Sequence, residues 1–282
     1  MFDFRYHALS LVAVFLALGI GIVLGVTIGD SLVSEAEKSV RASLRGDVVE
    51  ARDEAQRLSA DLERRDTFIE QAVPPLIEGR LGGREVAVVA FGSLPEDVES
   101  PVRDAVEAAG GEVDSTAVFE MPPDEGELGA AAGGRFARIG ADEDLLEDLG
   151  IRIGRSVATG GSIAARLERR LDERFQGDFD RPDAIVVYRQ EPEGEESDTA
   201  RILEEAVVGG LRRGGLPIVG VERSATDPSQ IPFYRKGEIS SVDSVDLAAG
   251  RAALVFALRG ARGRFGFKEG AERPLPEATS PR

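Results

Sequence analysis

The sequence predicts an α/β protein in which an N-terminal transmembrane helix and a coiled-coil stalk precede a mostly parallel sheet with helices on both faces. Three observations predict this arrangement. Residues 1–30 contain one long apolar run, residues 31–73 carry a heptad spacing of apolar side chains, and residues 83–260 alternate short apolar runs with helix-like segments. The end of the chain, residues 270–282, is polar and Pro-rich, and we expect a disordered tail there.

The apolar run predicts an uncleaved membrane anchor. Residues 8–28 are almost wholly apolar, and roughly 20 such residues suffice to cross about 30 Å of hydrocarbon as a helix. A cleaved signal sequence has a shorter apolar core of about 7–15 residues and a small-x-small cleavage site, whereas this run continues into VTIGDSLVSEAEK. A cleaved signal and a buried core helix remain the two alternatives.

The basic residues that flank the run do not by themselves determine its orientation. Arg5 precedes it, and Lys38, Arg41 and Arg45 follow it. A very short tail ahead of a long apolar helix is typical of a signal-anchor. We therefore expect a single-pass protein in contact with membrane lipid, with a cytoplasmic N-terminus and an extracytoplasmic C-terminal domain.

Small residues recur at every fourth position of the anchor and would lie along one side of its helix. In lipid, such a stripe lets two helix backbones approach closely, although Gly and Ala are also common in membrane helices generally. We expect a helix–helix seam made of Ala13, Ala17, Gly21, Gly25 and Gly29.

The segment after the anchor predicts a coiled coil. Its apolar residues alternate in steps of four and three, with Arg65 as a break. Pro74 and Pro75 should end the helix at Val73, because proline lacks the N–H and clashes with the preceding turn. An amphipathic helix packed on its own globular domain is the alternative. The coiled-coil interpretation predicts a parallel homodimer, with a seam made of Leu44, Val48, Ala51, Ala55, Leu58, Leu62 and Ile69.

The globular part should be built from strands that alternate with helices. The Val-rich residues 85–91 are typical of a strand buried on both faces, and a helix with proline near its start and glycine at its end should follow. The pattern recurs: further strands are expected at residues 112–119, 183–188 and 216–222, with helices at residues 198–213 and within VDSVDLAAGRAALVFALRG.

Composition and motifs argue against several kinds of chemistry. The net charge of −17 argues against nucleic acid as a partner. The chain contains no P-loop motif and no G-x-G-x-x-G turn after its first strand, it has no Cys, and its one histidine, His7, borders the anchor. Gly160, Gly161 and Ser162 precede a helix-like segment whose N–H groups could hold an anion, but a plain helix N-terminus is the simpler interpretation.

Metal binding has little support from the sequence. Copper prefers thiolate, thioether or imidazole ligands, and the chain offers only Met1, Met121 and His7. The acidic residues 191–198 are more typical of a solvated loop than of a cation site. We therefore predict no catalytic residue, no metal ligand and no cofactor, and we expect that the protein is not an enzyme. An enzyme that uses carboxylates would need a convergent acidic pocket.

Several blocks of the sequence carry a resemblance to a known family. They are FRYHALSLVAVFLALGIGIVLG, IVGVERSATDPSQIP, SSVDSVDLAAGRAALVFAL and GRFGFKEGAERPLP. Together with the heptad helix, they make the chain resemble, over nearly its full length, the family called copper transport outer-membrane protein MctB. The resemblance implies a single-pass envelope protein linked to copper homeostasis. The chain is also similar to relatives connected with septum formation, and that resemblance implies action with a partner on cell-wall hydrolysis.

One apolar helix cannot form a pore alone, since a membrane channel needs several helices or a closed barrel. We therefore expect a dimeric binding or regulatory scaffold within this copper-homeostasis family, with an envelope protein as a further candidate partner. The alternative is a septal cell-envelope regulator that acts through a partner on cell-wall hydrolysis.

Overall fold

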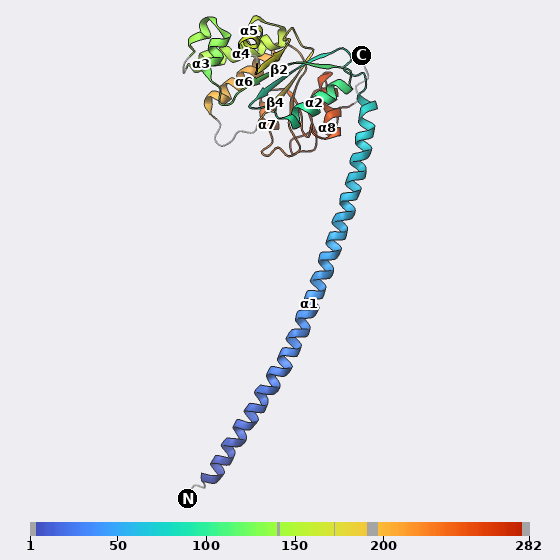
Figure 1. Cartoon of the computed structure of the whole chain (residues 1–282), viewed down its shortest axis with the longest axis vertical. Helices are drawn as coiled ribbons and strands as arrows, with labels where there is room; N and C mark the ends of the chain where they lie inside the picture. Colours follow the sequence, from blue (N-terminus) through green and yellow to red (C-terminus); the bar gives the residue numbers. More distant parts are fainter. Residues whose placement is uncertain (1–3, 140–141, 172, 191–196, 278–282) are drawn as a thin grey trace. The chain divides into compact units, whose positions relative to one another are not determined.

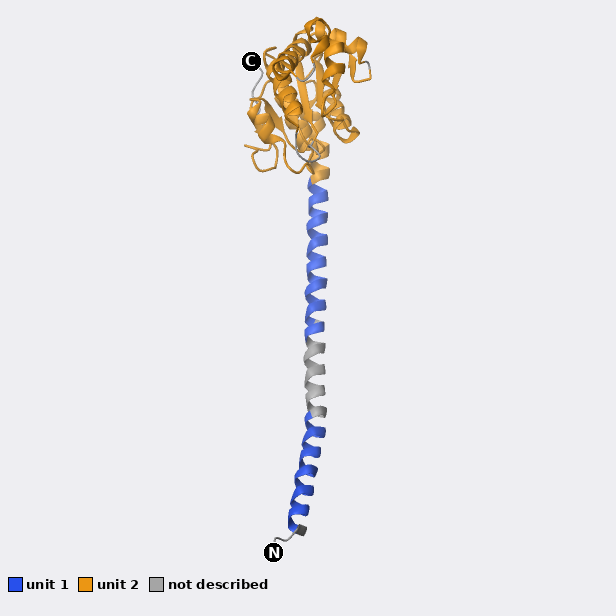
Figure 2. Cartoon of the chain, turned by 90° about the vertical axis from the view of Figure 1, so that its left-hand side faces the viewer, with its two compact units in different colours: residues 1–65 blue, residues 66–282 orange. Residues whose placement is uncertain are grey.

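The structure is a computed structural model that describes the backbone of residues 4–139, 142–171, 173–190 and 197–277. Side chains are described over the same ranges, apart from residues 4–5, 26–39 and 42. The chain divides into two compact units, Met1–Arg65 and Asp66–Arg282, drawn in blue and orange in Figure 2.

A long helix, α1 (Phe4–Ile77), forms the described part of the first unit and ends within the second (Figure 1). Its end lies one turn beyond the predicted end at Val73, and both Pro74 and Pro75 lie inside it. The prolines remove two intrahelical N–H donors. The last turn continues nevertheless, because Val73 and Ile77 are buried in the core of the second unit, where only 6% and 2% of their surface is exposed.

The second unit contains a seven-stranded sheet in the order β3-β2-β1-β4-β5-β6-β7. Neighbouring strands run parallel, except for the antiparallel pair of β2 and β3. The predicted α/β class with a mostly parallel sheet is therefore confirmed. The strands are β1 (Glu85–Phe91), β2 (Glu112–Phe119), β3 (Phe175–Gly177), β4 (Ala184–Arg189), β5 (Ile218–Val221), β6 (Ser240–Val242) and β7 (Arg264–Phe265).

Helices pack on both faces of this sheet. Val89 of β1 belongs to one apolar core cluster and Val88 to the other, because successive side chains of a strand point to opposite faces. The first cluster includes residues of α3 to α7, and the second includes residues of α2, α8 and the end of α1. The helices are α2 (Glu96–Ala108), α3 (Glu125–Ala132), the 3-10 helix η1 (Gly134–Arg138), α4 (Glu143–Thr159), α5 (Ser162–Arg170), α6 (Asp198–Arg212), α7 (Ile231–Lys236) and α8 (Ala248–Leu258).

Helices α4 and α6 pack with their backbones in direct contact. A Cβ atom at Gly154 would collide with the carbonyl oxygen of Val207, and one at Gly210 would collide with that of Ile151. Gly209, next to Gly210 on α6, faces open space. Glycine is therefore required at the crossing itself, because any side chain there would push the two helices apart.

Backbone hydrogen bonds hold residues 266–273 to each other and to β7, and Arg273 also donates to Glu277 at 2.7 Å. Glu272 N donates to Arg264 O at 2.8 Å, and Gly266 N donates to Arg273 O at 3.0 Å. The disordered tail expected over residues 270–282 stays a prediction, and residues 278–282 lie outside the part of the chain that the structure describes.

Candidate functional site

The predicted anchor is helical, and its described side chains are exposed. Residues Tyr6–Gly25 form a helix of 20 residues with a mean hydropathy of 2.6 and none of its residues buried, long and apolar enough to cross a membrane. The structure therefore does not show the buried core helix that was one alternative. A Cβ atom at Gly21 or Gly25 would meet nothing within 4 Å. Ala13 and Ala17 are exposed as well, whereas Gly29 lies among the residues whose side chains are not described.

The predicted stalk seam is exposed along most of its length. Leu44, Leu58 and Leu62 have 57%, 57% and 58% of their surface exposed. Val48, Ala51 and Ala55 are exposed too. Ile69, the last predicted seam residue, instead packs partly buried against the apolar cluster that includes α8. Close to it on α1, Glu70 accepts hydrogen bonds from Arg251 of α8 at 2.8 and 2.9 Å.

The carboxyl ends of the parallel strands are the place where ligands commonly bind in such sheets, above all where the strand order reverses. Here that point lies between β1 and β4. The side chain of Gln190 occupies it, because its Oε1 accepts hydrogen bonds from Ser93 N at 2.7 Å and from Ser93 Oγ at 3.0 Å. The first turn of α2 carries Glu96, Asp97 and Glu99, which would repel a phosphate. Gln190 and the acidic first turn of α2 therefore do not favour a phosphate at this point.

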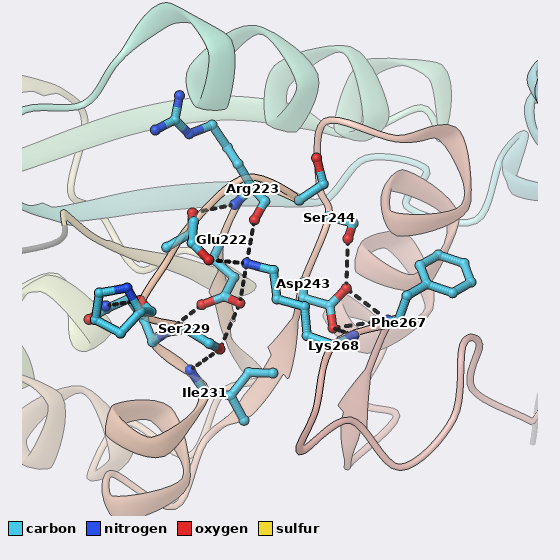
Figure 3. A network of polar contacts seen from close by, with 12 residues as sticks. Glu222, Arg223, Ser229, Ile231, Asp243, Ser244, Phe267 and Lys268 are labelled. Atoms are coloured by element: carbon cyan, nitrogen blue, oxygen red, sulfur yellow. Dashed lines mark hydrogen bonds and ion pairs between the residues drawn. The ribbon is translucent and has the colours of Figure 1, made fainter. Parts of the chain in front are cut away.

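Next to this point, a buried ion pair joins the end of β5 to the segment after β7 (Figure 3). Lys268 Nζ lies 2.9 Å from Glu222 Oε1, and the Glu222 side chain is 1% exposed. The ammonium also donates to Arg223 O and Thr226 O, both at 2.7 Å. Glu222 accepts further hydrogen bonds from Ser229 Oγ and from the backbone N–H of residue 230. Both charges are therefore compensated.

Asp243, at the end of β6, holds the same C-terminal segment through its backbone (Figure 3). Its carboxylate is fully buried. It accepts hydrogen bonds from Phe267 N at 2.9 and 3.0 Å, from Lys268 N at 2.9 Å and from Ser244 Oγ at 2.8 Å. The side chain thus supplies the acceptors that the exposed N–H groups of this segment need. Together, Glu222, Asp243 and Lys268 fasten the segment across the carboxyl ends of β5 and β6.

A second buried group lies at the end of β4. Arg189 donates to Glu204 Oε2 at 2.8 Å and to Gln230 Oε1 at 2.6 Å, and its guanidinium lies 4.6 Å from the ring centroid of Phe233. Tyr234 donates its hydroxyl to Val221 O at 2.8 Å. Burial, and after it the charge of Glu222, raises the pKa of Tyr234, so the phenol stays a neutral donor.

These polar groups were not predicted from the sequence, although part of the signal was present. Glu222 and Asp243 each directly follow a short buried strand, and a carboxylate at the end of such a strand needs partners. Nothing local points to Lys268 as that partner. The buried carboxylates of Glu222 and Asp243 accept hydrogen bonds from several donors. This network is therefore suited to holding the fold together rather than to acid–base chemistry.

The candidate anion site at Gly160, Gly161 and Ser162 is occupied by the protein itself. Ser156 Oγ accepts a hydrogen bond from Ala164 N at 2.8 Å, and Gly161 N donates to Ser156 O at 2.9 Å. A side chain of α4 therefore caps the N-terminus of α5, which supports the simpler interpretation of a plain helix N-terminus.

Among the described residues, no group of three or more His, Cys, Asp or Glu side chains could hold a metal ion. Carboxylates do gather near the edge of the sheet, where burial, with the charges of Asp178 and Glu112, raises the pKa of Asp114. Most of the acidic stretch 191–198 lies outside the described residues.

Comparisons with known proteins agree on one family. A family model described as "Copper transport outer membrane protein, MctB" matches residues 1–122 and 176–276. The unmatched interval contains α3, η1, α4 and α5. The match covers α1, strands β4 to β7 and the segments after β5, β6 and β7 that carry Glu222, Asp243 and Lys268. Proteins described as "Copper transporter MctB" from Mycobacterium bovis and Mycobacterium tuberculosis are 30% identical over 116 residues, 41% of this chain and 37% of theirs. The alignment thus spans well under half of these relatives.

Proposed function

The chain belongs to the family of the copper transport outer membrane protein MctB, and from this premise we propose that it acts as a membrane-anchored, dimeric scaffold in a copper-related envelope process. In this proposal the chain is not a pore by itself. The coiled-coil stalk pairs two copies in parallel, and the paired α/β domains bind or regulate a further envelope protein.

The observation that carries the proposal is the exposed apolar seam of the stalk. Six apolar residues at heptad spacing, from Leu44 to Leu62, are exposed in the single chain. A helix packed on its own globular domain would bury this stripe, whereas a second copy in register would cover it with knobs-into-holes contacts. The heptad pattern favours a second copy of this chain as the partner that covers the seam. Two identical helices in parallel register place the same apolar residues opposite each other.

The proposed role does not require the chain to ligate copper. The sequence has no Cys and one His, and copper prefers thiolate, thioether and imidazole ligands. Among the described residues, one helix is long and apolar enough to span a membrane, and a lone helix leaves no conduction path. Copper would then be handled by a partner or by an assembly that the scaffold organises.

We expect cysteine cross-linking to detect the dimer, since the chain has no native Cys. Ala55→Cys, on the seam, should form disulfide-linked dimers in membranes under mild oxidation. Ala60→Cys is the matched control, because it changes another exposed alanine of the same helix that lies about 140° away from Ala55 around the axis. The proposal predicts a high dimer yield at Ala55 and a low yield at Ala60.

In the Ala55→Cys background, Leu58→Asp should lower the dimer yield strongly, because burying an unpaired carboxylate costs several kcal/mol. Gly25→Leu should also lower it, whereas Gly19→Leu, on the other side of the anchor helix, should not. Equal yields at Ala55 and Ala60 would refute the stalk dimer.

The role of the dimer in copper handling can be tested in cells that lack the native chain. There, the Leu58→Asp variant should fail to restore copper tolerance. A failure limited to septum formation would instead favour the septal regulator.

The proposed orientation places the α/β domain outside the cytoplasm. A single cysteine at Ala130, an exposed residue of α3, should react with a membrane-impermeant maleimide in intact cells. A cysteine at Asp3, on the other side of the apolar segment, should react only after lysis. The reverse pattern would place the domain in the cytoplasm and redirect the search for its partner.

A further inference from the structure

The second unit has an open hollow at the amino ends of β5, β6 and β7. The Glu222–Lys268 ion pair lies at the other, carboxyl end of these strands. The hollow has a volume of about 500 Å³, and it is lined by the first residues of three parallel strands, Ile218, Ser240 and Arg264. Pockets for small molecules commonly measure roughly 300–1,000 Å³. The hollow is therefore large enough for a compact ligand.

Four arginines line this hollow: Arg212, Arg235, Arg262 and Arg264. Arg212 pairs with Glu238, and Arg264 pairs with Glu272 at 2.8 Å. The exposed guanidinium groups of Arg235 and Arg262 form no ion pair with any residue that the structure describes. Four guanidinium groups thus face two carboxylates, which leaves two uncompensated positive charges in a chain whose net charge is −17.

Helix ends account for part of this basic lining but not for all of it. Arg212 and Arg235 lie in the last turns of α6 and α7, where a positive charge interacts favourably with the helix dipole. Arg262 and Arg264 lie beyond the end of α8 at Leu258. The carbonyl oxygen of Leu258 already accepts a hydrogen bond from Arg84 at 3.2 Å. Arg264 pairs with Glu272 and donates through Nε to Gly270 O at 2.9 Å. Arg262 is therefore the arginine of this pair that neither a helix end nor an ion pair with a described residue explains.

The turns around the hollow leave its space free. Gly215 and Gly260 both line it with positive φ values of 75° and 105°, and a Cβ atom at either glycine would meet nothing within 4 Å. The glycines allow these tight turns, and they add no side chain that would fill the space between the arginines.

We propose that this hollow binds a compact soluble anion that carries two or more phosphate or carboxylate groups. The planar guanidinium presents paired N–H donors that match two oxygens of either group. Arg235 and Arg262 supply the uncompensated charge, and Arg212 and Arg264 border the site. The helix ends at α6 and α7 oppose an anion with partial charges only, so the arginines dominate the local potential.

The test is calorimetric titration of the full-length chain in detergent micelles with inorganic pyrophosphate and, separately, with citrate. At least one of these anions should bind at one per chain, and the affinity should fall as salt rises, because salt screens exposed charges. The double variant Arg235→Glu with Arg262→Glu should bind at least tenfold more weakly. Preference for pyrophosphate or for citrate tells whether the ligand carries phosphate or carboxylate.

The matched control is Arg169→Glu with Arg170→Glu, which makes the same charge change at two exposed arginines in the last turn of α5. This control should bind as the native chain does. Binding of neither anion, equal loss in both double variants, or full affinity in the Arg235/Arg262 variant would each overturn the proposal. If the glutamate variant fails to fold, Arg235→Gln with Arg262→Gln decides by the same criteria.

Discussion

Replacing Lys268 by methionine is expected to lower the free energy of unfolding of the α/β domain by about 3 kcal/mol, the lower end of the range for breaking a buried ion pair. Methionine keeps an apolar stem of similar length but removes the ammonium. Glu222, with 1% of its side chain exposed, then keeps a buried negative charge without its cation. The carbonyl oxygens of Arg223 and Thr226 lose a donor at the same time.

The matched control is Lys236→Met. Lys236 forms an ion pair with Glu205, but 62% of its side chain is exposed, and exposed pairs contribute about 0–1 kcal/mol. Thermal unfolding of the full chain, followed by circular dichroism in one detergent, measures both variants. For a domain of this size, about 1 kcal/mol corresponds to a midpoint shift of about 2–4 °C. Equally small shifts in both variants would show that the Glu222–Lys268 pair does not fasten the C-terminal segment.

Gly210→Ala is expected to destabilise the domain by about 2–3 kcal/mol, because the added methyl group would collide with Ile151 O at the crossing of α4 and α6. Overpacking of this kind typically costs about 1–3 kcal/mol, and a backbone atom on a packed helix moves less easily than a side chain. The collision exceeds the gain in helix propensity that alanine brings.

Gly209→Ala isolates that gain in propensity. It makes the same substitution one residue earlier on α6, where a Cβ atom would meet nothing within 4 Å. It should leave the domain as stable or stabilise it by up to about 1 kcal/mol. Opposite signs for the two neighbouring variants would confirm the close crossing. A stabilising Gly210→Ala would show that α4 and α6 are further apart than the structure places them.

The parts of the fold that were predicted correctly depend on local patterns. The strand at residues 85–91 was predicted because six consecutive apolar residues follow Glu85, and these six are buried on both faces. The long apolar helix near the N-terminus was recognised from length and composition alone. Both are properties of a few neighbouring residues, so no knowledge of distant chain segments was needed.

Other elements were missed even though they carried local signals. Helix α4 begins with Asp142 as its N-cap, which accepts a hydrogen bond from Leu145 N at 3.0 Å, and ends at Gly160 in the left-handed conformation. The predicted helix end at Val73 failed for a different reason. Proline rules describe an isolated helix, whereas the burial of Ile77 in the core supports another turn.

The sequence by itself determined the apolar helix, the α/β class and the family. Helix periodicity, strand periodicity and short motifs each depend only on residues that are close together in the chain. The tertiary structure alone decided that Glu222 meets Lys268, that α4 and α6 touch through glycines, and that Arg235 and Arg262 line one hollow. The physical reason is that strand order brings together segments that are far apart in the chain. Partners of buried charges and the lining of hollows depend on that order rather than on any local pattern.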